Sequence, residues 1–167
     1  MVYFFRDPRR NPPIDRAVVV SPADGRVTKV RRMVADQADS PTLVSIFLSP
    51  FDVHINRSPI AGKITEMSYV RGKFLMATNE MASLVNEQNV LTIEGENVTV
   101  VCRQIAGILA RRVVCWKKKG DNLELGERFG LIKFSSRTDV ILPANVMVTV
   151  VEGARVQGGT TVIGKIS

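Results

Sequence analysis

Ser21 to Thr28 reads Ser-Pro-Ala-Asp-Gly-Arg-Val-Thr, and a similar stretch, Ser-Pro-Ile-Ala-Gly-Lys-Ile-Thr, recurs from Ser58 to Thr65. Each copy indicates a tight turn that leads into a strand, because proline fixes φ on entry and glycine supplies a position with positive φ. The basic, aliphatic and threonine residues after each glycine alternate as they do along a strand. A third stretch, from Val151 to Val162, has the valine and glycine spacing of a hairpin corner.

Short apolar runs interrupted by glycine, proline and aspartate make up most of the remaining chain, a spacing typical of many short strands. They cover residues 17–20, 43–48, 98–101, 107–116, 131–134, 140–142, 146–151 and 162–166. Thr78 to Glu87 instead indicates a helix, because a capping residue precedes apolar residues at helical spacing. A chain of 167 residues has the length of one domain. We therefore predict a mainly-β, single-domain β-sandwich or barrel-sandwich-hybrid-like fold, similar to biotinyl and lipoyl carrier folds, with one or two short helices.

The charge of the chain indicates an anionic partner. There are 23 Lys and Arg against 16 Asp and Glu, a net charge of +7, which favours nucleic acid, acidic lipid or a phosphate-bearing substrate without choosing among them. No apolar run approaches the roughly 20 residues that a membrane-spanning helix needs. The segment Met1 to Arg10 joins aromatic residues to a basic cluster. That pattern suits either a membrane interface or an edge strand followed by a solvated arm.

The two cysteines carry no metal-binding signal. Cys102 and Cys115 lack Cys-x-x-Cys spacing, and one histidine is too few to complete a zinc site. We predict both to be small buried hydrophobic residues in a reducing compartment, and we predict no metal.

His54 is the only histidine of the chain. It lies between two Ser-Pro turns in a stretch whose alternation places Asp52, His54 and Asn56 on one face of a strand, with the opposite face directed to the core. A lone histidine is more often structural than catalytic, but a carboxylate and an amide on the same face are partners for proton transfer. His54 is therefore a candidate catalytic residue.

Asp24 is a second candidate, in the first of the two repeated turns. Asp-Gly is common turn chemistry, which favours a structural role. The second copy, however, has Ala61 at the equivalent position. The turn itself does not require a carboxylate.

Ser135 and Ser136 form an unusual hydroxyl pair inside the apolar run Gly130 to Leu142. Serine side chains compete for backbone hydrogen bonds and weaken a strand, so either a solvated strand end, a small bulge or chemistry explains the pair. A hydrolase is disfavoured because the chain has no Gly-x-Ser-x-Gly elbow. A serine hydroxyl can also attack the preceding carbonyl to form an ester, and elimination then leaves an N-terminal pyruvoyl group, with histidine and aspartate activating the hydroxyl.

Four ordered stretches resemble the short bacterial and archaeal phosphatidylserine decarboxylases, and the resemblance runs nearly end to end. They are Phe4 to Arg10, Ser21 to Gly25, Ser49 to Pro59 and Glu127 to Arg137. The resemblance implies a pyruvoyl-dependent enzyme that converts phosphatidylserine to phosphatidylethanolamine and carbon dioxide. The same mechanism on an archaetidylserine substrate remains an alternative.

The resemblance also implies roles for individual residues. Cleavage between Ser135 and Ser136 would give a β subunit of residues 1–135 and an α subunit of residues 136–167, whose covalent pyruvoyl group derives from Ser136. That group would form a Schiff base with the substrate amine and accept the electrons released with carbon dioxide, so no pyridoxal phosphate is needed. Asp24 matches the aspartate of an Asp/His/Ser self-processing triad, and His54 matches the histidine used in decarboxylation.

Two positions depart from the family pattern. Ser135 replaces the usual glycine before the cleaved bond, and its Cβ restricts that backbone. Arg57 stands where longer relatives have a second histidine, so either His54 serves both steps or Arg57 contributes electrostatically while another group takes the proton. We also predict Asp52, Asn56 and Arg57 as substrate-binding residues.

The predicted partners are an anionic phospholipid and a membrane surface, together with the α and β subunits of the same precursor; a homodimer is left open. We place the protein peripherally on the cytoplasmic face of the cell membrane, with an N-terminal anchor absent or removed. Two alternatives belong to other classes. A non-catalytic carrier or adaptor module would need a modifiable lysine at a hairpin, for which Lys117 to Lys119 lack the usual flanks. An RNA-binding β-barrel is disfavoured by an aromatic content of 6%, and we predict no nucleic-acid partner.

Overall fold

The computed structural model describes residues 6–72, 86–107 and 113–167. Within these ranges the chain forms strands and no helix. The strands are β1 (Val18–Val20), β2 (Gly25–Arg32), β3 (Thr42–Leu48), β4 (Ile55–Arg57), β5 (Gly62–Val70), β6 (Gln88–Glu94), β7 (Thr99–Ala106), β8 (Val113–Cys115), β9 (Asn122–Leu123), β10 (Arg128–Ile132), β11 (Ser136–Leu142), β12 (Val146–Val148), β13 (Arg155–Val156) and β14 (Val162–Ile166).

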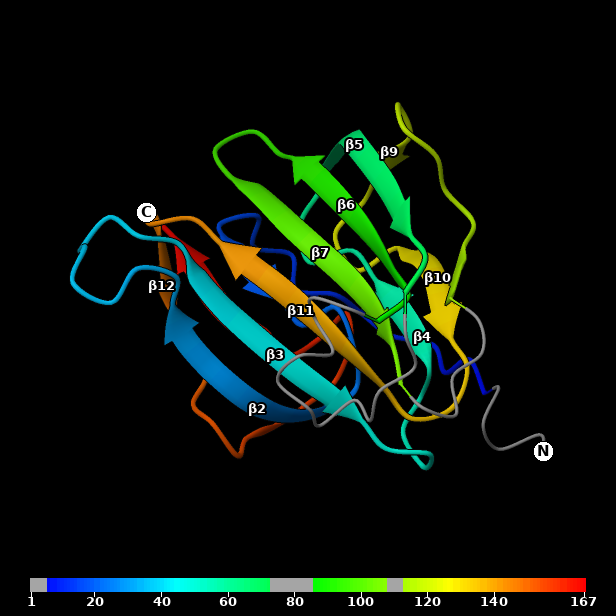
Figure 1. The fold of residues 1–167 in the computed structure, drawn as a ribbon. Coiled ribbons are helices and arrows are strands. Elements are labelled where there is room, and N and C mark those ends of the chain that lie inside the picture. Colours follow the sequence, from blue (N-terminus) through cyan, green and yellow to red (C-terminus); the bar gives the residue numbers. More distant parts are fainter. Residues whose placement is uncertain (1–5, 73–85, 108–112) are drawn as a thin grey trace.

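One curled, antiparallel sheet dominates the molecule (Figure 1). Its eight strands lie in the order β13-β2-β3-β11-β7-β6-β5-β9, and two three-stranded sheets, β1-β14-β12 and β4-β10-β8, accompany it. The predicted mainly-β fold is confirmed. The predicted helix from Thr78 lies outside the described residues except for Asn86 and Glu87, which are not helical.

The topology consists of two equivalent halves. Counted inward from one edge, the large sheet has the strands β13, β2, β3 and β11; counted inward from the other edge, it has their counterparts β9, β5, β6 and β7. The two small sheets match in the same way, with β1, β14 and β12 corresponding to β4, β10 and β8. The repeated Ser-Pro turns join the halves by reciprocal backbone bonds: Val20 N donates to Pro59 O at 3.0 Å and Arg57 N to Pro22 O at 2.9 Å. The repeat seen in the sequence is therefore the local sign of a duplicated unit.

Both turns lead into strands as predicted, since β2 begins at Gly25 and β5 at Gly62. Their hydroxyls make the same contact, from Ser21 Oγ to Ala23 O at 2.7 Å and from Ser58 Oγ to Ile60 O at 2.6 Å. The prediction that each glycine supplies a positive φ holds only for Gly25, at 147°. Gly62 is needed for space, because a Cβ there would meet the backbone of the neighbouring β6.

The hydrophobic core fills the concave side of the large sheet. Alternate residues of β3 and β11 point into it, including Val44, Ile46 and Leu48 from β3 and Val140 and Leu142 from β11. The alternation continues toward the start of β11, where Thr138 and Ser136 occupy the same face. The inward face of β11 is thus apolar at one end and hydroxyl-bearing at the other.

Candidate active site

Ser136 is the first residue of β11, a strand in the middle of the large sheet. It lies opposite Leu48 of β3 on one side and Ala106 of β7 on the other, and it is fully buried. Within the described part of the chain its Oγ has no hydrogen-bond partner. Buried hydroxyls are normally satisfied, so an orphaned one needs an explanation. A hydroxyl kept for reaction provides one, because this oxygen would make the attack that begins the conversion of Ser136 into a pyruvoyl group.

Ser135 lies in the short connection between β10 and β11, where the bond to Ser136 is located. Phe134, just before it, has φ of 65°, and it is the one non-glycine residue with positive φ among the described residues. The left-handed conformation costs a residue with a side chain roughly 1–2 kcal/mol. Backbone strain therefore lies next to the predicted cleavage site, one residue before the position at which we expected it.

His54 is buried beside this same connection. It precedes β4, and its carbonyl oxygen accepts a hydrogen bond from Ile132 N at 3.2 Å, at the end of β10. From Ile132 the chain needs only Lys133, Phe134 and Ser135 to reach Ser136. The structure thus brings the single histidine to the segment that carries the serine pair.

The stretch around His54 is buried on both faces, contrary to the prediction of one core face and one presented face. Only Ile55–Arg57 is a strand, and a second layer covers it because β4 is paired with β10 beneath the large sheet. Asp52 accepts hydrogen bonds from Ser49 N and from Arg155 Nη2, each at 2.8 Å. The Arg155 side chain is 62% exposed, so this ion pair extends from the buried carboxylate to the surface.

Asp24 is held by donors other than the serine hydroxyl. The Arg10 guanidinium binds both of its oxygens, at 3.0 and 2.8 Å, and Gly158 N donates to Oδ1 at 2.8 Å. Asp24 immediately precedes β2, and β3 lies between β2 and β11. Two strand spacings separate its backbone from that of Ser136 by roughly 10 Å. Asp24 therefore shares the end of the sheet with Ser136 and lies across β3 from it.

Asn56 and Arg57 also use their polar atoms within the protein. Asn56 bonds Thr138 Oγ1 and Gln104 Nε2 in the interior. Arg57 donates to Gly126 O at 3.1 Å and to Pro8 O at 2.9 Å. Burial lowers the pKa of its guanidinium, and the nearby Arg128 charge adds to that effect. Both residues are therefore already engaged in contacts inside the protein.

The contacts at this site include residues that the sequence reasoning missed. Arg10 on Asp24, Arg155 on Asp52 and Thr138 on Asn56 all come from segments distant in the chain. Arg10 was expected in a basic cluster at a membrane interface or in a solvated arm, whereas its side chain is only 10% exposed and binds Asp24. Arg155 could have been noticed only as an unassigned charge, and Thr138 as a threonine two residues after Ser136. No spacing rule joins them to their partners.

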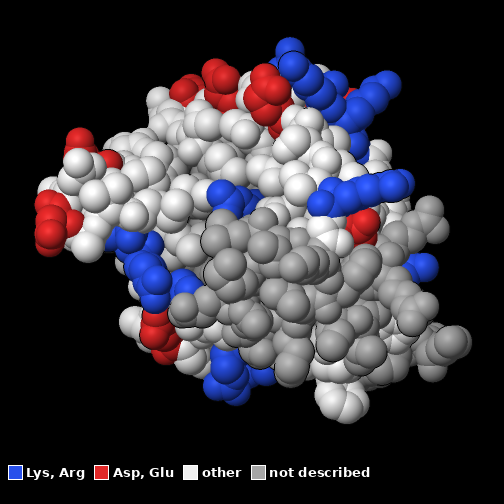
Figure 2. Space-filling model, in the orientation of Figure 1, with Lys and Arg blue, Asp and Glu red and all other residues white. Residues whose placement is uncertain are grey.

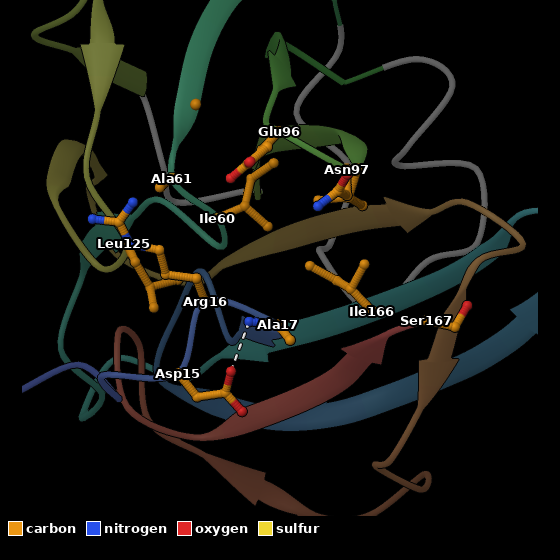
Figure 3. A pocket seen from close by; sticks show the side chains of 12 residues that line it. Asp15, Arg16, Ala17, Ile60, Ala61, Glu96, Asn97, Leu125, Ile166 and Ser167 are labelled. Atoms are coloured by element: carbon orange, nitrogen blue, oxygen red, sulfur yellow. Dashed lines mark hydrogen bonds between the residues drawn. The ribbon is translucent and has the colours of Figure 1, made fainter.

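A pocket lies away from the candidate active site. A cavity of about 600 Å³ adjoins the turn at Glu96 that precedes β7, whereas Ala106 at the far end of β7, roughly 24 Å away, faces Ser136. Figure 3 shows that its lining combines apolar side chains such as Ile60 and Ile166 with Asp15, which accepts a hydrogen bond from Ala17 N at 2.8 Å.

This pocket is the counterpart of the candidate active site in the other half of the molecule. Ala17 is the counterpart of His54, because each directly precedes the first strand of its half, β1 or β4. Ala61 is likewise the counterpart of Asp24, because each directly precedes the second strand, β5 or β2. Ala17 and Ala61 both line the pocket. The duplicated unit thus offers two similar ends, and the histidine and the aspartate belong to only one of them.

The cysteines are free thiols. Cys102 is buried as predicted, whereas Cys115 is only partly buried. Burial raises the pKa of both thiols, so neither is favoured as a thiolate nucleophile. No group of three or more His, Cys, Asp or Glu side chains in the described ranges is arranged to hold a metal ion.

Comparison with known proteins gives one consistent family. The family model described as phosphatidylserine decarboxylase matches residues 1–164. The phosphatidylserine decarboxylase proenzyme of Symbiobacterium thermophilum is 51% identical over 99% of this chain and 79% of its own length. Those of Gluconobacter oxydans and Chlorobium chlorochromatii are 49% and 45% identical, over 99% and 98% of this chain and 76% and 78% of their own.

These matches first define a class of enzyme, the carboxy-lyases that are made as proenzymes. Within that class, the chain belongs to the phosphatidylserine decarboxylase family. The function that goes with this membership is that of a phosphatidylserine decarboxylase proenzyme. It agrees with the predicted enzyme and not with the carrier or RNA-binding alternatives.

Proposed function

We propose that this chain cleaves itself between Ser135 and Ser136 into a β subunit of residues 1–135 and an α subunit of residues 136–167. The α subunit then carries a covalent pyruvoyl group derived from Ser136 and decarboxylates phosphatidylserine to phosphatidylethanolamine. The observation that carries the proposal is the buried, unpartnered Oγ of Ser136 directly after a strained connection. The group supplies a ketone that condenses with the substrate amine and accepts the electron pair left by carbon dioxide.

Self-cleavage proceeds by an acyl shift. Ser136 Oγ loses its proton and attacks the carbonyl carbon of Ser135, the peptide C–N bond breaks, and the amine that results keeps the proton. Removal of the Ser136 Cα proton expels the Ser135 carboxylate and leaves dehydroalanine. Its imine tautomer takes up water and releases ammonia, which leaves the ketone. His54, beside the connection, is the group that we assign to these proton transfers and to protonation of the product.

The carboxylates and arginines around the site have supporting roles in this proposal. Asp24 assists processing by holding Arg10 and Gly158 at the same end of the sheet. Asp52 binds the substrate through Arg155, whose exposed guanidinium suits an anionic headgroup. Asn56 supports the site from the protein interior through its hydrogen bond to Thr138. Arg57 supports it by holding the N-terminal segment in place through a hydrogen bond to Pro8 O.

We place the enzyme peripherally on the cytoplasmic face of the membrane. Among the described residues, no helix has the length and hydropathy that a bilayer crossing requires. On the face shown in Figure 2, Lys and Arg side chains are interspersed with Asp and Glu. The net charge of +7 favours attraction to an acidic lipid. The backbone of the lipid, glycerol ester or archaeal ether, leaves the mechanism unchanged.

Intact-mass spectrometry of the purified protein tests the proposal. We expect two chains in the wild type, the smaller with a blocked, ketone-reactive N-terminus, and one uncleaved chain in Ser136→Ala. Ser45→Ala is the matched control, because Ser45 is also a buried serine of the large sheet whose Oγ lacks a partner in the described ranges. Cleavage that persists in Ser136→Ala, or a wild type that stays intact, would overturn the proposal.

A further inference from the structure

Four polar side chains are buried together on the concave side of the large sheet, near the end that carries Ser136. Asn56, Gln104 and Thr138 are fully buried, and Asn89 is 4% exposed. They come from four different strands, β4, β7, β11 and β6 in that order. Buried amides and hydroxyls are costly unless they are hydrogen-bonded, so a cluster of this kind must form an internal network.

The network is a linear chain of hydrogen bonds. Asn89 Nδ2 donates to Gln104 Oε1 at 3.0 Å, Gln104 Nε2 donates to Asn56 Oδ1 at 2.9 Å, and Asn56 Nδ2 donates to Thr138 Oγ1 at 3.1 Å. It begins on β6, crosses β7 and leaves the large sheet for β4. It then returns to the sheet on β11.

A backbone group fixes the direction of the whole chain. Gln104 Nε2 also donates to the carbonyl oxygen of Val114, at 3.2 Å. A carbonyl can only accept, so the NH₂ group of Gln104 must face that side. Asn56 then has to present its oxygen to Gln104 and its NH₂ group to Thr138. The orientation of the Asn56 amide is therefore not free to reverse.

The last bond joins the two segments of the candidate active site. Thr138 lies two residues after Ser136 on the same face of β11, and Asn56 lies two residues after His54. The hydrogen bond between Asn56 and Thr138 thus sets the distance between the strand that begins with the nucleophile and the segment that carries the histidine. It does so from the interior, where water does not compete.

We propose that the Asn56–Thr138 bond, held in direction by Gln104 and Asn89, is a positioning device that keeps His54 aligned with residue 136. This inference rests on the proposed function and assigns it residues that are neither nucleophile nor proton carrier. Before cleavage, the connection through Ser135 also holds the start of β11 next to β10. After cleavage that covalent link is gone, and the network remains as the side-chain contact from β11 to β4. The alignment of His54 with residue 136 therefore depends more on this network during decarboxylation than during self-cleavage.

The matched pair Thr138→Val and Thr138→Ser tests this directly. Valine has nearly the shape of threonine but lacks the hydroxyl, whereas serine keeps the hydroxyl. We expect Thr138→Val to lower kcat for decarboxylation roughly 10- to 100-fold, the range for a small misplacement of reacting groups, and to slow self-cleavage less. KM should stay close to wild type, whereas the thermal midpoint should fall by roughly 2–10 °C, because the buried NH₂ group of Asn56 loses its acceptor. Thr138→Ser should restore kcat, and Thr92→Val on β6 serves as the control for valine in the same sheet.

Every outcome bears on the inference. If Thr138→Val turns over within twofold of wild type, or if Thr138→Ser is equally impaired, the hydroxyl does not position the site and the inference is wrong. A drop in thermal midpoint without a change in kcat would mean a purely structural role. If Thr138→Val does not fold, Gln104→Met removes the bond that orients Asn56 and should give the same loss of kcat. The Ser136→Ala experiment tests a different point: if that variant is still cleaved, the proposed function is wrong, whereas the Thr138 variants test only the positioning role.

Discussion

Phe134 is held in the left-handed region immediately before the serine pair. Most residues with a side chain avoid this conformation, and such strain persists where the surrounding structure enforces it. Here β10 and β11 anchor the connection on both sides. The strain is thus positioned where the proposed chemistry breaks a peptide bond.

A pair of substitutions separates backbone strain from the aromatic ring. Phe134→Gly and Phe134→Ala both remove the ring, but only glycine adopts a positive φ without cost. If strain of about 1 kcal/mol assists the acyl shift, the glycine variant should cleave roughly fivefold more slowly than the alanine variant. The rate is measured from the appearance of the smaller chain on a gel. Equal rates in the two variants would show that the strain is not used.

At the scale of elements, two connections reach the surface with a phenylalanine each. Phe51, between β3 and β4, is 70% exposed, and Phe134, between β10 and β11, is 40% exposed. Both connections lead directly to candidate site residues, to Asp52 and His54 in one case and to Ser136 in the other. The carbonyl of Phe51 accepts a hydrogen bond from Arg6 Nη2 at 2.9 Å, which places a cation at the same tip. Aromatic and cationic groups at loop tips suit a lipid interface.

Vesicle binding tests this role of the β3–β4 connection. Phe51→Ser should weaken binding to phosphatidylcholine vesicles that contain phosphatidylserine by roughly thirtyfold, because a phenylalanine contributes about 2 kcal/mol when it leaves water. Val151→Ser is the matched control, since Val151 is also 70% exposed but lies between β12 and β13. Co-sedimentation gives the bound fraction. Equal binding by the two variants would place the membrane contact elsewhere.

At the scale of the whole molecule, the proposed α subunit is an internal part of the fold. It contributes β11 between β3 and β7, β14 between β1 and β12, and β13 on the edge of β2. Asp52 and Asp24, both in the proposed β subunit, also bind Arg155 and Gly158 of residues 136–167. A cut before Ser136 therefore removes one covalent link from an otherwise continuous sheet.

We expect the two chains to stay together after cleavage. Strand ladders and buried apolar side chains hold them, and salt screens neither. Size-exclusion chromatography in about 1 M salt should therefore give one peak that contains both chains, and separation should need a denaturant. Release of the smaller chain by salt alone would contradict this arrangement.

The mainly-β class and the repeated turn with its two strands could be predicted from the sequence, because turn residues and period-2 alternation are local properties of the chain. The sequence also offered Ser136, His54 and Asp24 as candidates: Ser136 as part of a hydroxyl pair in an apolar run, His54 as the single histidine, and Asp24 because the repeated turn has Ala61 at that position. It did not predict strand β6, whose asparagine and glutamine at the start obscure the apolar alternation.

The contacts that connect these residues follow from the way the chain folds. The pairing of Asp24 with Arg10, of Asp52 with Arg155 and of Asn56 with Thr138 depends on strand order and register. Of these three pairings, the one between Asp52 and Arg155 joins positions 103 apart in the chain. No local pattern encodes such a contact, since it forms only when a curled sheet closes over its own buried polar groups. The candidate site residues could therefore be chosen by residue type from the sequence, but their positions relative to one another depend on the fold.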